Sequence, residues 1–199
     1  GNTIVANGSA GTGKTFCAMY LALNDILEQG CTQKKIIIVR SIVSTGKDIG
    51  ALPGELYEKI APFEEPYVSI VNDLIHKGKD SAYRSMKDLG IIEFMPTTFI
   101  RGLTWDDAIV IVDEVQNLEW QEIVSVCTRI GKNSKLFLIG DRVQNDFDYS
   151  RKVKSGFDNL MRVVGNMKDV DVIKFTREDI VRSGFVKEFI LACEDEHLL

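Results

Sequence analysis

Short apolar runs alternate with longer amphipathic stretches along the whole chain. Six of the apolar runs have the length of a β-strand: residues 3–7, 35–40, 91–95, 108–113, 135–140 and 170–175. Helical patterns follow most of them: residues 14–29, 54–76, 119–130, 156–165 and 184–193. Such alternation is typical of a parallel sheet covered by helices on both faces. We therefore predict an α/β fold, a three-layer sandwich with a mostly parallel sheet.

The pattern continues without an evident linker, internal repeat or low-complexity tract, so we expect a single domain over residues 1–199. A chain of 199 residues is long enough to bury a sizeable core. The run Ile109-Val110-Ile111-Val112 is apolar throughout, which is expected of a strand buried on both faces. Because the chain begins at Gly1 and enters an apolar run almost at once, we expect a truncated chain or a processed product, so that any N-terminal segment of the parent protein is not seen.

Composition and charge narrow the class of protein. A hydrophobic share of 45% with 27% charged residues is that of a soluble globular protein. No apolar run approaches the ~18 residues that cross a bilayer, and no secretory signal is visible, so we expect no membrane partner. A net charge of −5 does not favour coating nucleic acid by bulk charge, although a local basic groove is compatible with it.

The four cysteines are widely spaced and form no CxxC pair, which fits a reducing, cytoplasmic location. Cys17 and Cys127 fall within apolar helical patterns, so we expect both to be buried free thiols.

A glycine-rich segment joins the first predicted strand to the first predicted helix. It consists of Gly8-Ser9-Ala10-Gly11-Thr12-Gly13-Lys14-Thr15 and matches the GxxxxGK[ST] motif. Glycines allow such a backbone to curl so that its N–H groups point at phosphate oxygens, and the helix start adds partial positive charge. Lys14 would reach the β- and γ-phosphates and the Thr15 hydroxyl would bind Mg²⁺. The motif predicts a site for a nucleoside triphosphate with Mg²⁺.

An acidic pair, Asp113 and Glu114, closes the apolar run at 108–113. Because parallel strands present their carboxyl ends to one crevice, both carboxylates would face the nucleotide. We assign Asp113 to holding Mg²⁺ through its water shell and Glu114 to the general base that polarises the attacking water. The alternative, a pair of charges at the start of a helix, loses weight because a P-loop lies about 100 residues upstream.

Two further strand ends carry candidate phosphate contacts. The run at 135–140 leads to Gln144, which could touch the γ-phosphate and report hydrolysis, or lie in a polar turn. The run at 170–175 leads to Arg177 and Arg182, and an arginine there can reach the γ-phosphate or cap a surface helix. The residue patterns leave these alternatives open.

Together these segments resemble the nucleotide-binding core of superfamily 1 helicases and, more closely, the PhoH family of P-loop ATPases. The helicase-like segments are the P-loop, DEVQ at 113–116, GDRVQ at 140–144 and VRS at 181–183. The PhoH-like segments are IGALPG at 49–54 with Glu55, EKI at 58–60, Pro62, Pro66, RGLT at 101–104, Asp107-Ala108, Gln116-Asn117, TRIG at 128–131 and Ser155-Gly156. One departure is Ser41, since the family usually has proline after the residue that corresponds to Arg40.

The resemblance implies a RecA-like P-loop domain that hydrolyses ATP with Mg²⁺. It implies that Gln116 and Gln144 sense the γ-phosphate and that Arg182 corresponds to the helicase arginine that contacts it. The choice of ATP rests on the resemblance, because the adenine-recognising segment of helicase-like relatives would lie upstream of this chain.

The resemblance also implies work on RNA or single-stranded DNA, with a path over the loops at 40–54 and 97–104. The basic run at 151–154 (Arg151, Lys152, Lys154) could add phosphate contacts or be solvated loop charge. Phe99 and Trp105 could stack on bases or belong to the core.

Two other function classes are compatible with a P-loop. One is a nucleotide-gated module that binds a protein partner and hydrolyses slowly, which the second carboxylate, Glu114, disfavours. The other is a small-molecule kinase, which the helicase-like Gln144 disfavours. We therefore favour the nucleic-acid-coupled ATPase.

Assembly follows from the resemblance as well. Two-domain helicases bring an arginine to the γ-phosphate from their second domain, and we expect a neighbouring subunit to supply it here. We therefore expect a homo-oligomer, possibly a hexameric ring in view of PhoH-like proteins. The candidate donors are Arg101, Arg142, Arg151 and Arg177.

Overall fold

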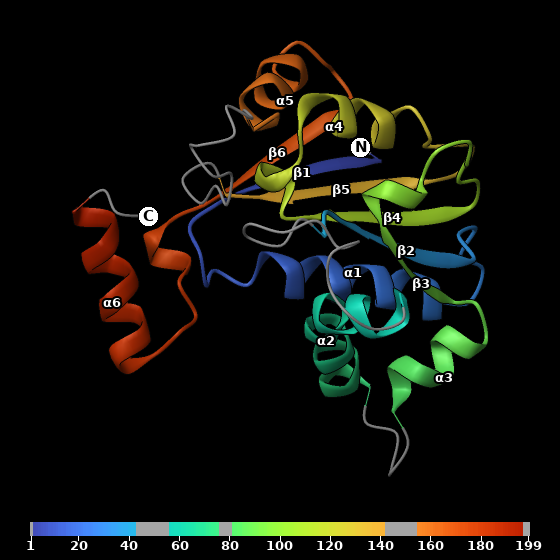
Figure 1. The fold of residues 1–199 in the computed structure, drawn as a ribbon, viewed down its shortest axis with the longest axis horizontal. Coiled ribbons are helices and arrows are strands. Elements are labelled where there is room, and N and C mark those ends of the chain that lie inside the picture. Colours follow the sequence, from blue (N-terminus) through green and yellow to red (C-terminus); the bar gives the residue numbers. More distant parts are fainter. Residues whose placement is uncertain (1, 43–55, 76–80, 142–154, 197–199) are drawn as a thin grey trace.

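The computed structural model describes residues 2–42, 56–75, 81–141 and 155–196. Six strands form one sheet in the order β3-β2-β4-β5-β1-β6, and all five pairings are parallel (Figure 1). The strands are β1 (Thr3–Gly8), β2 (Lys35–Arg40), β3 (Ile92–Pro96), β4 (Ala108–Asp113), β5 (Lys135–Gly140) and β6 (Val170–Phe175). The predicted fold class is confirmed, and β3 lies one residue later than expected.

Helices cover both faces of this sheet and make the three predicted layers (Figure 1). One face carries α1 (Lys14–Leu27), α2 (Leu56–Leu74) and α3 (Ala82–Asp88), and the other carries α4 (Trp120–Cys127) and α5 (Phe157–Val164). After β6 comes α6 (Gly184–Asp195), which has no buried residue. The sequence pattern predicted all of these helices except α3. With seven residues, α3 is too short for a clear helical period and is marked mainly by its cap, Ser81, which accepts a hydrogen bond from the Arg84 N–H.

Two cores fill the spaces between the layers, and alternate residues of the same strands supply both. Ile109 and Ile111 of β4 pack with α1 and α2, whereas Val110 and Val112 pack with α4 and α5. All six residues of β4 are buried, which confirms the expectation for an apolar strand covered on both faces. The sheet is therefore a rigid support for whatever follows the carboxyl ends of its strands.

The structure places four side chains that the sequence analysis interpreted. Cys17 is exposed, so its predicted burial is wrong: α1 turns Ala18, Met19, Ala22 and Leu23 inward and Cys17 falls on the outer side. Cys127, at the end of α4, is partly buried. Trp105 is a core residue at 3% exposure, before the amino end of β4, whereas Phe99 is 49% exposed.

None of the helices in the described ranges combines the length and the apolar character that a membrane span requires.

Candidate functional site

The candidate site lies at the edge of the sheet where the parallel strands end. The P-loop follows β1, Asp113 ends β4, Asp141 follows β5 and Arg40 ends β2. Because β5 pairs with both β1 and β4, it separates the P-loop strand from the strand that carries the acidic pair. This order brings segments that are about 100 residues apart in the chain to one crevice.

The P-loop backbone requires glycine for reasons that the structure makes explicit. A Cβ on Gly8 would lie 2.0 Å from the Phe175 carbonyl oxygen, because β6 passes directly beside it. Gly13 has a φ of 80° and sits at the start of α1, a left-handed conformation that few other residues adopt without strain. Within the loop, the Thr12 hydroxyl donates to the Ser9 carbonyl at 2.8 Å. Close packing against β6 and a left-handed turn thus explain why glycine occupies positions 8 and 13 of the motif.

Lys14 lies over the loop that precedes it. Its ammonium group donates to the carbonyl oxygens of Gly8 at 2.6 Å and Ser9 at 2.7 Å. Burial lowers the pKa of Lys14, while the neighbouring carboxylates of Asp141, Glu114 and Asp113 act in the opposite direction. The ammonium therefore sits among three acidic groups at the mouth of the P-loop. Asp141, which the sequence interpretation did not assign, is one of them, and it is only 6% exposed.

Thr15 and Asp113 meet across the crevice. The Thr15 hydroxyl donates to Asp113 Oδ1 at 3.1 Å, which joins the first turn of α1 to the end of β4. A hydroxyl and a carboxylate are hard oxygen ligands of the kind that Mg²⁺ prefers, with waters and phosphate oxygens completing its shell. These two side chains therefore fit a magnesium ion, and they are the two that the sequence predicted for it.

Asp113 has two further hydrogen-bond donors. The Tyr67 hydroxyl, from α2, donates to Asp113 Oδ2 at 2.7 Å, and the Glu114 N–H donates to Oδ1 at 3.1 Å. Burial raises the pKa of Tyr67 well above its ordinary value, so the hydroxyl keeps its proton and remains a donor. Sequence analysis missed Tyr67, because only the packing of α2 against β4 brings it to the carboxylate.

Arg40 is a third site residue that sequence analysis did not assign. Burial opposes the charged form of its guanidinium group, but interactions with Tyr67, Asp113 and Glu114 outweigh this effect and raise the pKa of Arg40. The register pairs Arg40 with Asp113, so both side chains leave the sheet on the same face. A charged residue that ends an apolar strand is the one sequence signal that could have singled it out.

Glu114 stands at a sharp turn after β4. Its φ and ψ of 54° and 46° are left-handed, an uncommon conformation for glutamate. Gln116 Nε2 donates to Glu114 Oε2 at 2.5 Å, and Gln116 Oε1 accepts from the Asp141 N–H at 3.0 Å. Gln116 is 2% exposed and thus joins the candidate base to the end of β5. Its role as a γ-phosphate sensor stays a prediction.

Arg182 lies against the P-loop. A Cβ on Gly11 would be 3.0 Å from Arg182 Cγ, and the Val181 N–H donates to the Gly11 carbonyl at 3.1 Å. Arg177, by contrast, is held by α6, where it pairs with Glu194 at 2.8 Å and Asp195 at 2.6 Å. The predicted contact Gln144, the basic run at 151–154 and most of the loop at 40–54 lie outside the described residues.

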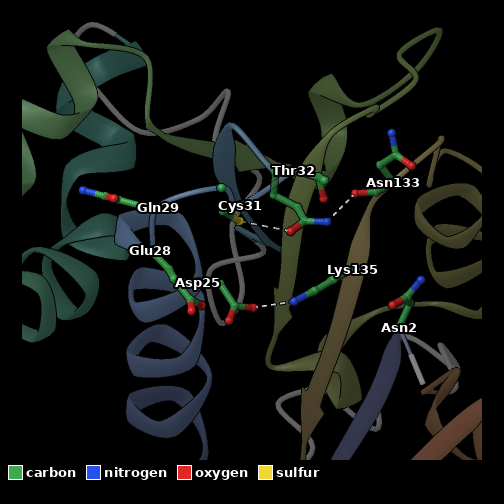
Figure 2. Close-up of a pocket in the computed structure, with 10 residues that line it drawn as sticks. Asn2, Asp25, Glu28, Gln29, Cys31, Thr32, Asn133 and Lys135 are labelled. Carbon is green, nitrogen blue, oxygen red and sulfur yellow. Dashed lines mark hydrogen bonds and ion pairs between the residues drawn. The ribbon is translucent and has the colours of Figure 1, made fainter.

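A separate hollow of about 500 Å³ lies at the opposite edge of the sheet, where β1 and β5 begin (Figure 2). Figure 2 shows Lys135 reaching toward Asp25 across it, and these two form an ion pair of 2.6 Å. Gln33 also spans it, accepting from the Cys31 thiol and donating to the Asn133 carbonyl. This hollow contains none of the predicted site residues, so the candidate site is the opposite, carboxyl edge.

A parallel sheet in this order, with a GxxxxGK[ST] loop after β1 and an acidic pair at the end of β4, defines a RecA-like P-loop nucleoside triphosphatase fold. Within that class the chain belongs to the family described as PhoH-like protein, whose model matches residues 2–194. The resemblance that the sequence motifs indicated is therefore confirmed.

Two relatives illustrate the match. The chain is 36% identical over 190 residues to the PhoH-like protein of Bacillus subtilis (strain 168), covering 96% of this chain and 57% of the relative. It is 30% identical over 192 residues to Protein PhoH of Escherichia coli (strain K12), covering 95% of this chain and 52% of the relative. The chain thus spans about half the length of the curated relatives that it matches.

Among solved structures, the large terminase from a thermophilic bacteriophage has a similar fold. The two superpose with a TM-score of 0.52 at 14% identity, over 94% of this chain and 44% of the terminase chain. At this identity the likeness concerns the fold alone.

Proposed function

We propose that this chain is a Mg²⁺-dependent ATPase whose turnover is coupled to RNA or single-stranded DNA. The observation that carries the proposal is the contact between Thr15 and Asp113 at 3.1 Å, beside Lys14 and Glu114. A hydroxyl, a carboxylate, a lysine and a second carboxylate are the groups that P-loop enzymes use to hold Mg²⁺ and a triphosphate and to activate water. Membership of the PhoH-like family supports the same reading.

Each group of the site has a defined task in the proposed reaction. The P-loop N–H groups and Lys14 bind the phosphates, and for this the Lys14 ammonium exchanges its bonds to the loop carbonyls for phosphate oxygens. Thr15 and Asp113 would hold Mg²⁺, and the bound ion would supply positive charge against the negative charge that develops on the phosphates. Glu114 accepts the proton of the attacking water. Hydrolysis releases ADP and phosphate.

The position of Arg182 supports a contribution from the same chain. Its side chain packs beside Gly11, and the backbone of the preceding residue is tied to that glycine. An arginine next to the γ-phosphate stabilises transition-state charge. We therefore include Arg182 among the residues that act on the phosphates.

Replacing the candidate base tests the chemical step. Glu114→Gln keeps the size of the side chain but cannot take a proton, so ATP should still bind while turnover falls by roughly 10²–10⁴-fold. The measurements are phosphate release under saturating ATP and binding of a fluorescent ATP analogue. Glu93→Gln is a matched control, because Glu93 lies on the edge strand β3 in an ion pair with Lys35. Turnover at the wild-type rate in Glu114→Gln would contradict the assignment of the base.

Coupling to nucleic acid is tested by adding single-stranded RNA and DNA to the turnover assay. We expect stimulation that weakens steeply with added salt, because contacts to phosphates release counterions. Neutralising Lys152 and Lys154 together should reduce the stimulation and leave basal turnover unchanged. If neither RNA nor DNA changes the rate, the partner-gated module with slow hydrolysis becomes the better reading.

A further inference from the structure

A buried tyrosine supports the carboxylate that is proposed to hold Mg²⁺. Tyr67 is completely buried in the core between α2 and the sheet, where its ring lies 5.7 Å from that of Phe94. Its hydroxyl donates to Asp113 Oδ2 at 2.7 Å. A buried tyrosine normally directs its hydroxyl to a partner, but this partner belongs to the nucleotide site rather than to the core.

The hydrogen bonds of Asp113 divide between its two oxygens. Oδ1 accepts from the Thr15 hydroxyl and from the Glu114 N–H, on the side of the P-loop. Oδ2 accepts from Tyr67, on the side of α2. With one oxygen held from behind, the carboxylate plane cannot rotate freely, and Oδ1 stays directed at Thr15.

Arg40 continues the chain of contacts away from the nucleotide. Its guanidinium group interacts with the Tyr67 side chain, and the strand register places Arg40 beside Asp113. The bond from Tyr67 to Asp113 has the form of the outer-shell hydrogen bonds that orient metal-binding carboxylates in proteins, and Arg40 lies next to it.

We propose that Tyr67 is a positioning residue for Mg²⁺: it fixes the orientation of Asp113, and Arg40 in turn fixes the orientation of Tyr67. The inference rests on the proposed function, since it assigns Asp113 to the metal. It adds to that function a contribution from α2 and β2, two elements outside the P-loop and the acidic pair.

The same fold offers a matched control. Tyr83 of α3 is 3% exposed and its hydroxyl donates to Glu64 at 2.6 Å. Glu64 lies 5% exposed between α2 and α3 and also binds Lys87. Tyr83→Phe therefore removes a buried bond from a tyrosine hydroxyl to a carboxylate, as Tyr67→Phe does, but in a contact between the two helices α2 and α3 rather than at Asp113.

The test is a magnesium titration of nucleotide binding. Binding of a fluorescent ATP analogue is measured against Mg²⁺ concentration, and separately in EDTA, for wild type, Tyr67→Phe and Tyr83→Phe, with thermal unfolding recorded for each. We expect Tyr67→Phe to raise the half-saturating Mg²⁺ concentration by roughly 10–100-fold, the usual effect of losing an outer-shell partner. Affinity in EDTA should stay unchanged. Tyr83→Phe should leave the half-saturating Mg²⁺ concentration unchanged.

Two further variants separate positioning from other causes. In an Asp113→Asn background, Tyr67→Phe should add no further shift, because the residue acts through Asp113. Arg40→Met gives opposite results under two mechanisms. If Arg40 acts only as a positive charge, its loss would tighten Mg²⁺ binding. If Arg40 orients Tyr67, its loss would weaken Mg²⁺ binding. We expect weaker binding. Arg40→Met also carries the test if Tyr67→Phe does not fold.

An unchanged half-saturating Mg²⁺ concentration in Tyr67→Phe, or an equal shift in Tyr83→Phe, would overturn the inference and leave the proposed function standing. A full shift of the half-saturating Mg²⁺ concentration by Tyr67→Phe in the Asp113→Asn background would also overturn the inference. If wild type binds the nucleotide with the same affinity with and without Mg²⁺, both the inference and the proposed function fail.

Discussion

At the scale of single residues, the neighbouring carboxylates of Asp113 and Glu114 bind different hydrogen-bond partners. Asp113 is held by Thr15 and Tyr67, whereas Glu114 is held by Gln116. The left-handed backbone at Glu114 makes this division possible, because it breaks the regular alternation of a strand at the point where β4 ends. Two acids next to each other in sequence can therefore serve a metal and a water separately.

Lys14 gives the most direct test at this scale. Lys14→Ala should remove most of the affinity for ATP, because the triphosphate loses its direct cationic partner in a partly buried site that already contains three carboxylates. The measurement is a titration with a fluorescent ATP analogue. Lys34→Ala is a suitable control, since Lys34 is an exposed lysine in an ion pair with Asp107, which precedes β4. If Lys14→Ala and wild type bound the ATP analogue with equal affinity, the assignment of residues 8–15 as a phosphate-binding P-loop would be wrong.

At the scale of elements, the sequence predicted those helices and strands whose formation depends on a local pattern of apolar residues. Four of the six strands have the predicted bounds, because each is a mainly apolar run of six residues, a length typical of strands. The P-loop and Asp113 fall at strand ends for the same reason. Tyr67 could not be assigned, since its contact with Asp113 depends on which face of α2 rests on the sheet. That packing joins two residues 46 positions apart and leaves no local mark. Arg40 left only a weak signal, a charge at the end of an apolar strand.

Helices α1 and α4 carry cysteines in different surroundings, which predicts different reactivity. Burial raises the pKa of Cys127 to about 11, whereas Cys17 is exposed on α1. The thiolate is the nucleophile, so at pH 8 Cys127 should resist iodoacetamide while Cys17 is alkylated. Between pH 8 and 10 the rate at Cys127 should rise about tenfold per pH unit, because the thiolate fraction does so below the pKa.

Peptide mass spectrometry after timed alkylation measures both rates in one sample. Denaturant should abolish the difference, which controls for peptide-specific detection. Rapid alkylation of Cys127 at pH 8 in the folded protein would contradict the burial of this end of α4.

At the scale of the whole molecule, α6 differs from the other helices in having no buried residue. Helix α6 stands apart from the three layers in Figure 1, and Phe185 and Phe189 on it are 76% and 58% exposed. Its Ile190 nevertheless lies near Gly11 of the P-loop. The nucleotide site thus borders a surface that is accessible from outside the molecule.

We propose that a second copy of this chain completes the nucleotide site with an arginine. The test mixes Glu114→Gln subunits with subunits in which one candidate, Arg101, Arg142, Arg151 or Arg177, is replaced by alanine. If the arginine acts across an interface, some interfaces pair an intact base with an intact arginine, and turnover partly returns. Mixing Glu114→Gln with Lys14→Ala subunits is the control, because both defects lie within one subunit's own site and should not complement.

Light scattering in the presence of ATP and Mg²⁺ measures the assembly independently. A monomer under these conditions, together with no recovery for any of the four candidates, would refute the shared site. Recovery with one candidate would identify the donor and bring that residue within reach of a neighbour's γ-phosphate.

The left-handed turn at Glu114 has a consequence for anyone who engineers this protein. A non-glycine residue in that conformation costs about 1–2 kcal/mol, which glycine would not incur. A laboratory selection for heat resistance alone would therefore favour glycine at position 114. If Glu114 is the base that we propose, the selected protein would survive higher temperatures but hydrolyse ATP roughly 10²–10⁴-fold more slowly. Screening libraries of this chain for thermostability and for turnover should thus give opposite rankings at this one position.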